Sequence, residues 1–239
     1  MLKIIMLMLT VTLTVTAYNI NQIQLTNNKK SLKIIKFNNQ ILFTGLKNRG
    51  LYTLQSQEIL PKSITIINLY KNNDSIIIET DKGFYKYNQK TLLKTQDNKV
   101  KQENQKIYLK INGVWKKISP NNNDIYYAPK TTKDFVLFSG VKSGILLYDI
   151  KKQKTTFISK GVDALFSSDG QKVTFAKVYD DGEKYTDSEI FIYDIKSSKI
   201  IKVLDKKQNE INRYPYLDQN TLYFNKNFDI FKINLSKEL

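Results

Sequence analysis

The densest group of residues suited to chemistry is the acidic segment 180–189, which reads Asp-Asp-Gly-Glu-Lys-Tyr-Thr-Asp-Ser-Glu. Its carboxylates belong to Asp180, Asp181, Glu183, Asp187 and Glu189. Ca²⁺ takes about six to eight oxygen ligands of this kind. The spacing matches no standard calcium loop, however, and an exposed hairpin between two strands has the same composition. We therefore expect a solvated loop, with calcium binding as the alternative.

The residue types that this chain lacks exclude several kinds of catalysis. The sequence has no histidine and no cysteine, which removes the Ser-His-Asp triad, cysteine nucleophiles and most zinc sites. Arg49 and Arg213 are the only arginines, whereas sialidase-type sites need three. We therefore predict that the chain is not an enzyme, and we assign no catalytic, cofactor-binding or metal-binding residue and no cofactor.

One kind of enzyme remains open as an alternative. A pair of carboxylates can cleave a glycosidic bond, one as the acid and the other as the base or nucleophile. The acidic residues of this chain lie mostly at expected turns, which argues against such a pair. Two carboxylates that face a central channel would favour a carbohydrate-active enzyme.

The formal net charge is +16, and nearly all of the positive charge is lysine. Such a field favours acidic partners or anionic polymers. The alternative is the codon bias of an AT-rich genome, which enriches lysine, asparagine and isoleucine without any such partner. Lysine lacks the planar fork with which arginine reads bases, so we expect no nucleic-acid partner. Residues 161–195 differ from the rest, because eight acids against three lysines give this segment a net charge of −5.

A short phrase that recurs along the chain indicates which elements position these residues. Each copy places an aromatic or large apolar residue in an alternating strand after a turn. The copies are Gly50–Leu54, Gly83–Tyr87, Gly113–Lys117, Gly144–Tyr148, Glu189–Tyr193 and Asp229–Ile233. The 179 residues from Gly50 to Asp229 span five intervals of about 36 residues, a period typical of repeat architectures.

Short alternating runs between turns predict an all-β chain without a helix of useful length. The upstream strand of the third unit is weak. The clearest expected strands are 31–37 and 41–44, then 63–69 and 76–78, then 107–109, then 125–128, 135–138, 145–150 and 155–158, then 163–166, 172–175, 189–195 and 199–204, and finally 213–217, 221–224 and 229–233. The fourth and fifth units thus contain four strands each, and the last unit contains three.

The fifth unit carries a resemblance to a known family. It reads Gly-Val-Asp-Ala-Leu-Phe-Ser-Ser-Asp-Gly over 161–170, then Gln-Lys-Val-Thr-Phe, then Ile-Phe-Ile-Tyr-Asp-Ile over 190–195. This resembles the repeat of TolB-like propellers, with Ser168 in place of the usual proline. The likeness covers roughly the last 110 residues and implies a six-bladed β-propeller of four-stranded antiparallel blades and a periplasmic binding role. A five-bladed ring is the alternative, and the α/β domain of TolB has no counterpart.

The N-terminal residues predict two further features. Lys3, the apolar run 4–15 and the small residues up to Ala17 have the layout of a signal peptide over residues 1–17, with a membrane anchor as the alternative. Residues 18–239 would then form a single domain. Because the last unit lacks a fourth strand, we expect residues 18–26 to pair with it and close the ring, with a frayed N-terminal tail as the alternative.

Together these observations predict an exported, non-catalytic β-propeller, periplasmic or secreted, that binds or scaffolds an envelope or periplasmic protein. We expect a monomer without a transmembrane segment after cleavage. The alternatives are a carbohydrate-active propeller enzyme and a lysine-driven binder of anionic envelope polymers.

Overall fold

The computed structural model describes residues 22–27, 30–38, 40–55, 57–72, 75–89, 91–95 and 99–235. Throughout these residues the chain forms β-strands, and the one helical element is the 3₁₀ turn η1 (Leu46–Asn48). The prediction of an all-β chain is confirmed. The described part contains no helix with the length and hydropathy of a membrane span. The predicted signal peptide lies outside the described residues.

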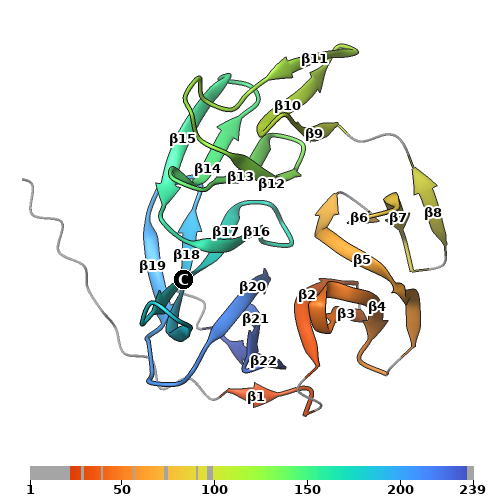
Figure 1. Cartoon of the computed structure of the whole chain (residues 1–239), viewed down its shortest axis with the longest axis vertical. Helices are drawn as coiled ribbons and strands as arrows, with labels where there is room; N and C mark the ends of the chain where they lie inside the picture. Colours follow the sequence, from red (N-terminus) through yellow and green to blue (C-terminus); the bar gives the residue numbers. More distant parts are fainter. Residues whose placement is uncertain are drawn as a thin grey trace, which may run out of the picture.

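The strands form antiparallel sheets that follow one another in chain order around a common centre (Figure 1). The first sheet has seven strands: β2 (Ser31–Phe37), β3 (Gln40–Gly45), β4 (Arg49–Thr53), β5 (Glu58–Asn72), β6 (Ser75–Thr80), β7 (Gly83–Tyr87) and β8 (Leu92–Thr95). Next comes a three-stranded sheet of β9 (Val100–Glu103), β10 (Lys106–Ile111) and β11 (Val114–Lys117).

Three four-stranded sheets complete the order. They are β12 (Tyr126–Thr131), β13 (Phe135–Gly140), β14 (Gly144–Asp149) and β15 (Lys154–Ser159); β16 (Val162–Phe166), β17 (Lys172–Asp180), β18 (Tyr185–Asp194) and β19 (Ile200–Leu204); and β20 (Asn212–Asp218), β21 (Thr221–Lys226) and β22 (Asp229–Asn234) with β1 (Ile23–Gln24). In each of these sheets the residues predicted as strands lie within observed strands, except for one to three residues at some ends.

The strand β5 explains why the first sheet has seven strands. Its first half pairs with β4, where Leu51 faces Leu60, and its second half from Ile66 onward pairs with β6. One continuous strand of 15 residues is therefore the last strand of one four-stranded unit and the first strand of the next. Pro61 is tolerated because it lies in the half that forms the outer edge of its unit, where no neighbour needs an N–H donor.

The N-terminal segment pairs with the last sheet, as the sequence predicted. Ile23 faces Lys232 and Gln24 faces Phe231 in an antiparallel register. The backbone N–H of Leu25 donates to the Ile230 carbonyl at 2.7 Å. The Thr26 hydroxyl accepts from the Ile230 N–H at 2.9 Å and donates to Asp229 at 3.1 Å. The outer edge of β22 is thereby covered, whereas residues 18–21 lie outside the described part.

Apolar side chains fill the spaces between neighbouring sheets. Leu137 and Ile145 of one sheet form a cluster with Val173 and Phe175 of the next. The rings of Phe175 and Phe191 stack with centroids 5.3 Å apart. Such burial of apolar side chains is the main favourable contribution to folding.

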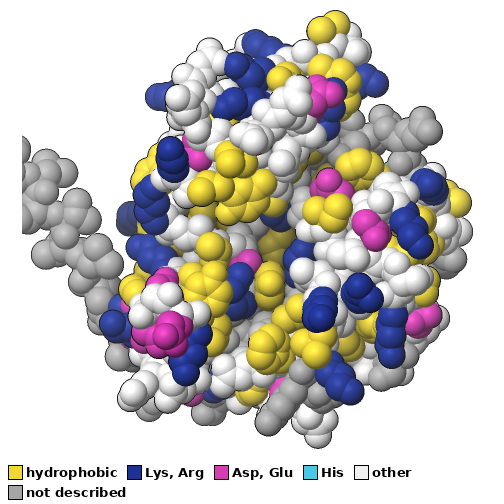
Figure 2. Space-filling view, in the orientation of Figure 1, with side chains coloured by type: hydrophobic (Ala, Val, Ile, Leu, Met, Phe, Trp, Pro, Cys, Tyr) yellow, Lys and Arg dark blue, Asp and Glu magenta, His cyan; other side chains and the backbone are white. Residues whose placement is uncertain are grey.

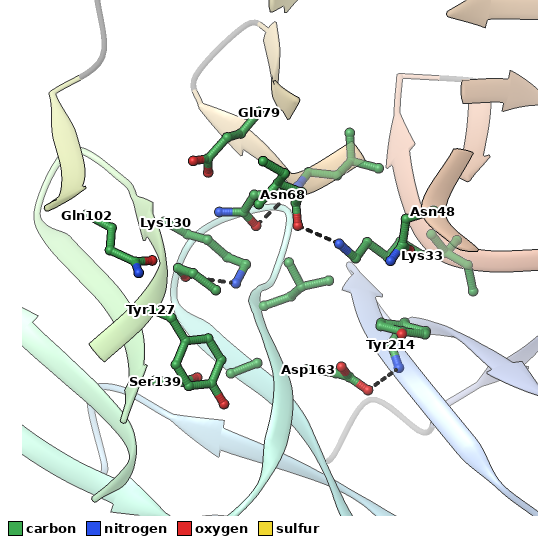
Figure 3. Close-up of a pocket in the computed structure, with 16 residues that line it drawn as sticks. Lys33, Asn48, Asn68, Glu79, Gln102, Tyr127, Lys130, Ser139, Asp163 and Tyr214 are labelled. Carbon is green, nitrogen blue, oxygen red and sulfur yellow. Dashed lines mark hydrogen bonds between the residues drawn. The ribbon is translucent and has the colours of Figure 1, made fainter. Parts of the chain in front are cut away.

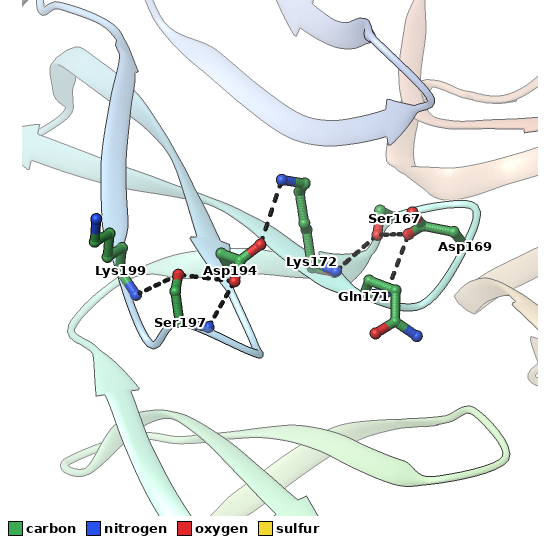
Figure 4. Close-up of polar contacts among 7 residues, drawn as sticks. All are labelled: Ser167, Asp169, Gln171, Lys172, Asp194, Ser197 and Lys199. Carbon is green, nitrogen blue, oxygen red and sulfur yellow. Dashed lines mark hydrogen bonds and ion pairs between the residues drawn. The ribbon is translucent and has the colours of Figure 1, made fainter. Parts of the chain in front are cut away.

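The Ser-Ser-Asp-Gly turn between β16 and β17 is held by its own side chains (Figure 4). The Ser167 hydroxyl donates to Asp169 at 2.6 Å and accepts from the Lys172 N–H at 2.9 Å, while Asp169 accepts from the Gln171 N–H at 3.0 Å. Gly170 has a φ of 71°, which glycine adopts without strain. These bonds fix the register of β16 against β17.

We predict that removal of residues 18–27 lowers the melting temperature by about 3 to 10 °C, because it exposes the edge of β22 and removes the bonds at Thr26. Thermal unfolding followed by circular dichroism measures the effect. Thr26→Val should reproduce part of the loss, whereas Ile23→Ser at a half-exposed position should change little. Identical transitions for the full and shortened chains would contradict a stabilising role for β1.

Candidate functional site

A cavity of about 340 Å³ lies where the first strands of the successive units approach one another. Figure 2 shows that this face of the molecule is hollowed near its centre. The polar side chains around the cavity come from several sheets; they are Lys33, Asn48, Asn68, Glu79, Gln102, Tyr127, Lys130, Ser139, Asp163 and Tyr214 (Figure 3). A volume near the lower end of the usual ~300–1,000 Å³ for small-molecule sites suits a ligand of monosaccharide size.

A bulge that recurs at the same place in five first strands positions these side chains. The register shifts between Ser31 and Ile34 in β2, Ile66 and Asn68 in β5, Tyr127 and Lys130 in β12, Val162 and Leu165 in β16, and Arg213 and Tyr216 in β20. A bulge turns side chains away from the regular alternation and is common beside active sites. Here it brings Lys33, Asp163 and Tyr214 to the cavity.

The backbone at three of these bulges adopts a left-handed conformation that is rare for residues other than glycine. The φ angles are 51° at Ala128, 56° at Asp163 and 52° at Tyr214. Each such residue costs about 1–3 kcal/mol and persists only where the surroundings impose it, often at functional sites. Because three units adopt the same strained backbone at the same place, the packing of the sheets imposes the shape of the cavity rim.

The residue just after the bulge shows which units carry polar groups into the interior. Ile34, Leu165 and Tyr216 are apolar or aromatic and buried at this position, whereas two other units place Asn68 and Lys130 there. Asn68 is 3% exposed and donates to the Pro129 carbonyl at 2.9 Å, which ties β5 to the bulge of β12. Polar residues at positions that otherwise build the core cost stability, so they point to a function.

Lys130 is the most unusual of these residues. Its side chain donates to the Ala128 carbonyl at 3.1 Å, and the residue is only 7% exposed. Burial lowers the pKa of Lys130 to about 8, and the positive charge of Lys33 lowers it further, while Asp163 and Glu79 oppose this shift. A lysine of this kind changes its charge just above neutral pH, which suits it to anion binding and proton transfer.

Lys33 reaches the cavity from a different strand than Lys130 (Figure 3). Its ammonium group donates to the carbonyls of Ile66 at 3.3 Å and Ile67 at 2.5 Å. Burial lowers the pKa of Lys33 to about 8, against the attraction of Asp163 and Glu79. At neutral pH both lysines are mostly protonated, so the cavity carries two partly desolvated positive charges.

Two carboxylates also line the cavity, and they differ in their surroundings. Burial raises the pKa of Glu79, although Asn68, Lys130 and Lys33 favour its charged form. Asp163 instead forms a bidentate ion pair with Arg213, through Nε to Oδ2 and through Nη2 to Oδ1 at 3.1 Å. Asp163 and Arg213 therefore form a fixed, neutral pair, and Glu79 is the carboxylate suited to exchange a proton.

The acidic segment 180–189 lies in the β17–β18 hairpin, where its carboxylates bind nearby groups. Asp180 accepts from the Gly182 N–H at 3.1 Å, and Asp181 accepts from the N–H groups of Glu183 and Lys184 at 3.0 Å. Glu189 pairs with Tyr179 at 2.6 Å and with Lys202 at 3.3 Å. No cluster of three or more potential ligands suited to a metal ion occurs among the residues that the structure describes.

Comparisons with known proteins bear on the fold. The structure is similar to that of a gluconolactonase from Xanthomonas campestris, with a TM-score of 0.61 and 7% identity over 91% of this chain and 90% of that one. The fold is propeller-like. A puromycin-hydrolyzing peptidase of Mycobacterium tuberculosis has a TM-score of 0.50 and 7% identity over 87% of this chain and 43% of that one. Virginiamycin B lyase of Staphylococcus aureus has a TM-score of 0.45 and 14% identity over 91% and 99%. No family model and no curated protein matches the sequence.

The prediction that this chain is not an enzyme is wrong. The solved structure of a gluconolactonase shares the propeller-like fold over 91% of the chain, so the fold itself offers no ground for excluding catalysis. The missing histidines and cysteines exclude particular mechanisms only. The structure also brings two carboxylates, Glu79 and Asp163, to one central cavity, and of these only Glu79 is not held in an ion pair with Arg213.

The sequence alone identified none of the cavity residues Lys33, Asn68, Glu79 and Lys130. A signal for two of them was present. If the units are aligned on their first strands, Asn68 and Lys130 occupy a column that holds Ile34, Leu165 and Tyr216 in the other bulged strands. With 38 lysines and arginines in the chain, Lys130 could be recognised only through the strand register.

We predict that Lys130→Met raises the free energy of unfolding at pH 7, by up to about 3 kcal/mol. Lys130 loses its proton at about pH 8 in the folded protein but near 10.5 when unfolded. Its charge therefore destabilises the fold fully below pH 8 and progressively less up to pH 10.5. Denaturant unfolding at pH 7 and pH 10 checks this, with exposed Lys196→Met as the control. A variant less stable than the parent at pH 7 would contradict the prediction.

Proposed function

We propose that this chain is a propeller enzyme that opens the lactone of a sugar-derived acid in its central cavity. One observation carries the proposal: the buried Lys130 and the partly buried Lys33, both with lowered pKa values, line the same small cavity as Glu79, whose pKa is raised. Perturbed titratable groups that converge in a cleft are candidates for acid–base chemistry. The likeness in fold to a gluconolactonase supports this choice of substrate class.

The charges in the cavity favour an anionic product and an anionic transition state. Lys33 and Lys130 are positive at neutral pH, and the Asp163–Arg213 pair is neutral overall. When water attacks a lactone carbonyl, negative charge develops on the carbonyl oxygen. An ammonium group in a partly desolvated site stabilises such a charge far better than bulk water does. We assign this role to Lys130, and we assign to Lys33 the binding of the sugar hydroxyls or the carboxylate.

Glu79 supplies the proton transfer in this proposal. As a carboxylate it takes a proton from the attacking water, and as a carboxylic acid it returns that proton to the ring oxygen as the C–O bond breaks. The product is the open hydroxy acid, so the reaction consumes one water and needs no other reactant. The raised pKa of Glu79 brings it closer to neutral pH, where a group that both takes and gives a proton works best.

Two further proposals concern the number of blades and the export of the chain. We propose that β5 is shared by two blades, that the three-stranded sheet is one blade, and that β1 completes the last blade, which gives six blades with a TolB-like repeat. The pairing of β1 with β22 supports this count. We also propose that the chain is exported to the periplasm or secreted, as Lys3, the run 4–15 and Ala17 indicate.

We predict that purified protein accelerates the hydrolysis of glucono-1,5-lactone above its spontaneous rate, measured with a pH indicator at pH 6.5. Glu79→Gln should lower the added rate at least tenfold because it removes the proton transfer, as general acid–base groups contribute about 10²–10⁴-fold. Exposed Glu183→Gln is the matched control. Equal rates with the parent protein and Glu79→Gln would refute the assignment.

Ligand binding can be measured separately from catalysis, and it tests which class of molecule the cavity accepts. Gluconate and galacturonate should raise the melting temperature of the parent protein and of Glu79→Gln, but not that of Lys130→Met, whereas neutral glucose should have no effect. The affinity for gluconate should fall above pH 8, because both lysines lose their charge near that pH. An equal response to glucose would argue against an anion site.

We predict that the exported protein begins at Tyr18. Intact-mass spectrometry of protein recovered from the periplasm or medium of a producing bacterium measures this, because removal of residues 1–17 gives a defined loss of mass. Replacement of two apolar residues in the run 4–15 by aspartate should keep the chain inside the cell with its original start. Recovery of only the uncleaved chain from the cytoplasm would contradict export.

A further inference from the structure

The three-stranded sheet differs from the other sheets at its outer edge. β11 pairs with β10, and no further strand pairs with it among the residues that the structure describes. All four residues of β11 are exposed, including Val114 at 69% and Trp115 at 36%. An open strand edge presents unpaired N–H and C=O groups and is a template for another strand.

One face of this sheet carries a basic and aromatic surface. The register places Lys101 opposite Tyr108, Tyr108 opposite Lys117, and Lys110 opposite Trp115, so these five side chains share a face. We refer to them as the β9–β11 face. The Lys101 ammonium group lies 4.7 Å from the Trp115 ring centroid and 5.6 Å from that of Tyr108. Basic side chains gather over this end of the molecule in Figure 2.

The charge around the edge selects the kind of strand that fits. Residues 99–119 contain six lysines and one acid, Glu103, for a net charge of +5. Two copies paired through β11 would bring two such surfaces together, so their repulsion opposes self-association, which is the usual effect of lysine on an edge strand. The same charge attracts an acidic strand.

We propose that β11 is a docking edge for an extended acidic segment of a partner protein, which adds to the sheet as its fourth strand. Alternate acidic side chains of the segment would lie on the β9–β11 face near Lys110 and Lys117. The apolar side chains between them would lie on the opposite face, where Val114 is exposed. Backbone hydrogen bonds give such additions their affinity, and the alternation of side chains gives them specificity.

The chain contains a natural probe for this edge, because Trp115 is its only tryptophan. We expect a seven-residue peptide of alternating glutamate and valine, blocked at both ends, to change the Trp115 fluorescence of the full chain in a saturable manner. The change should weaken as salt rises from 50 to 300 mM. A lysine–valine peptide of the same length should produce no change. Failure of the acidic peptide to bind would overturn the proposal.

Two controls separate strand addition from simple attraction of anions. The same acidic peptide with every internal amide N-methylated cannot form a ladder, and its binding should be at least tenfold weaker. The double variant Lys110→Glu, Lys117→Glu should weaken binding of the unmodified peptide at least tenfold, whereas Lys196→Glu, Lys199→Glu at another exposed turn should not. Equal binding of the N-methylated peptide, or equally tight binding of heparin, would show an anion surface and overturn strand addition.

Discussion

The bulge in the first strand of five units is the constraint on which the central cavity depends. Regular alternation would direct every second side chain of these strands into the packing between sheets, as it does for Ile34 and Leu165. The extra residues instead turn Lys33, Asp163 and Tyr214 toward the centre. The left-handed backbone at Ala128, Asp163 and Tyr214 is a local cost of this arrangement, which the packed sheets around it sustain.

The fold was far more visible in the sequence than the site was. Turn residues and alternating apolar residues are local signals, and they located β2 and most strands from β12 onward to within a few residues. The continuous strand β5 was missed because Pro61 resembles a break, and proline is tolerated there only because that half is an outer edge. The site depends on which strands face the centre and in what register. Lys130 and Glu79 look like ordinary residues of a lysine-rich chain until that register is known.

Lysine serves two opposite purposes in this molecule. On the β9–β11 face Lys110 and Lys117 are exposed to solvent, while Lys101 lies over the Trp115 ring and pairs with Glu103. In the cavity, Lys130 is buried and Lys33 is partly buried, and both donate to backbone carbonyls, where their charge costs stability but is available to a ligand. Natural proteins commonly retain such costs where a function requires them. Charged residues are most closely spaced along the chain in the acidic hairpin, yet the buried charge lies in the cavity. Burial of charge is therefore a better sign of an active site in this molecule than the number of charged residues.

The continuity of β5 also has a mechanical consequence. Because one uninterrupted backbone runs from the rim of one unit to the centre of the next, these two units cannot hinge against each other without bending a strand that pairs with β4 along its first half and with β6 along its second half. Lys33 and Asn68, which lie in the two units that this continuous strand joins, are therefore held at a fixed separation, and the bond from Asn68 to the Pro129 carbonyl extends the same constraint to the bulge that carries Lys130.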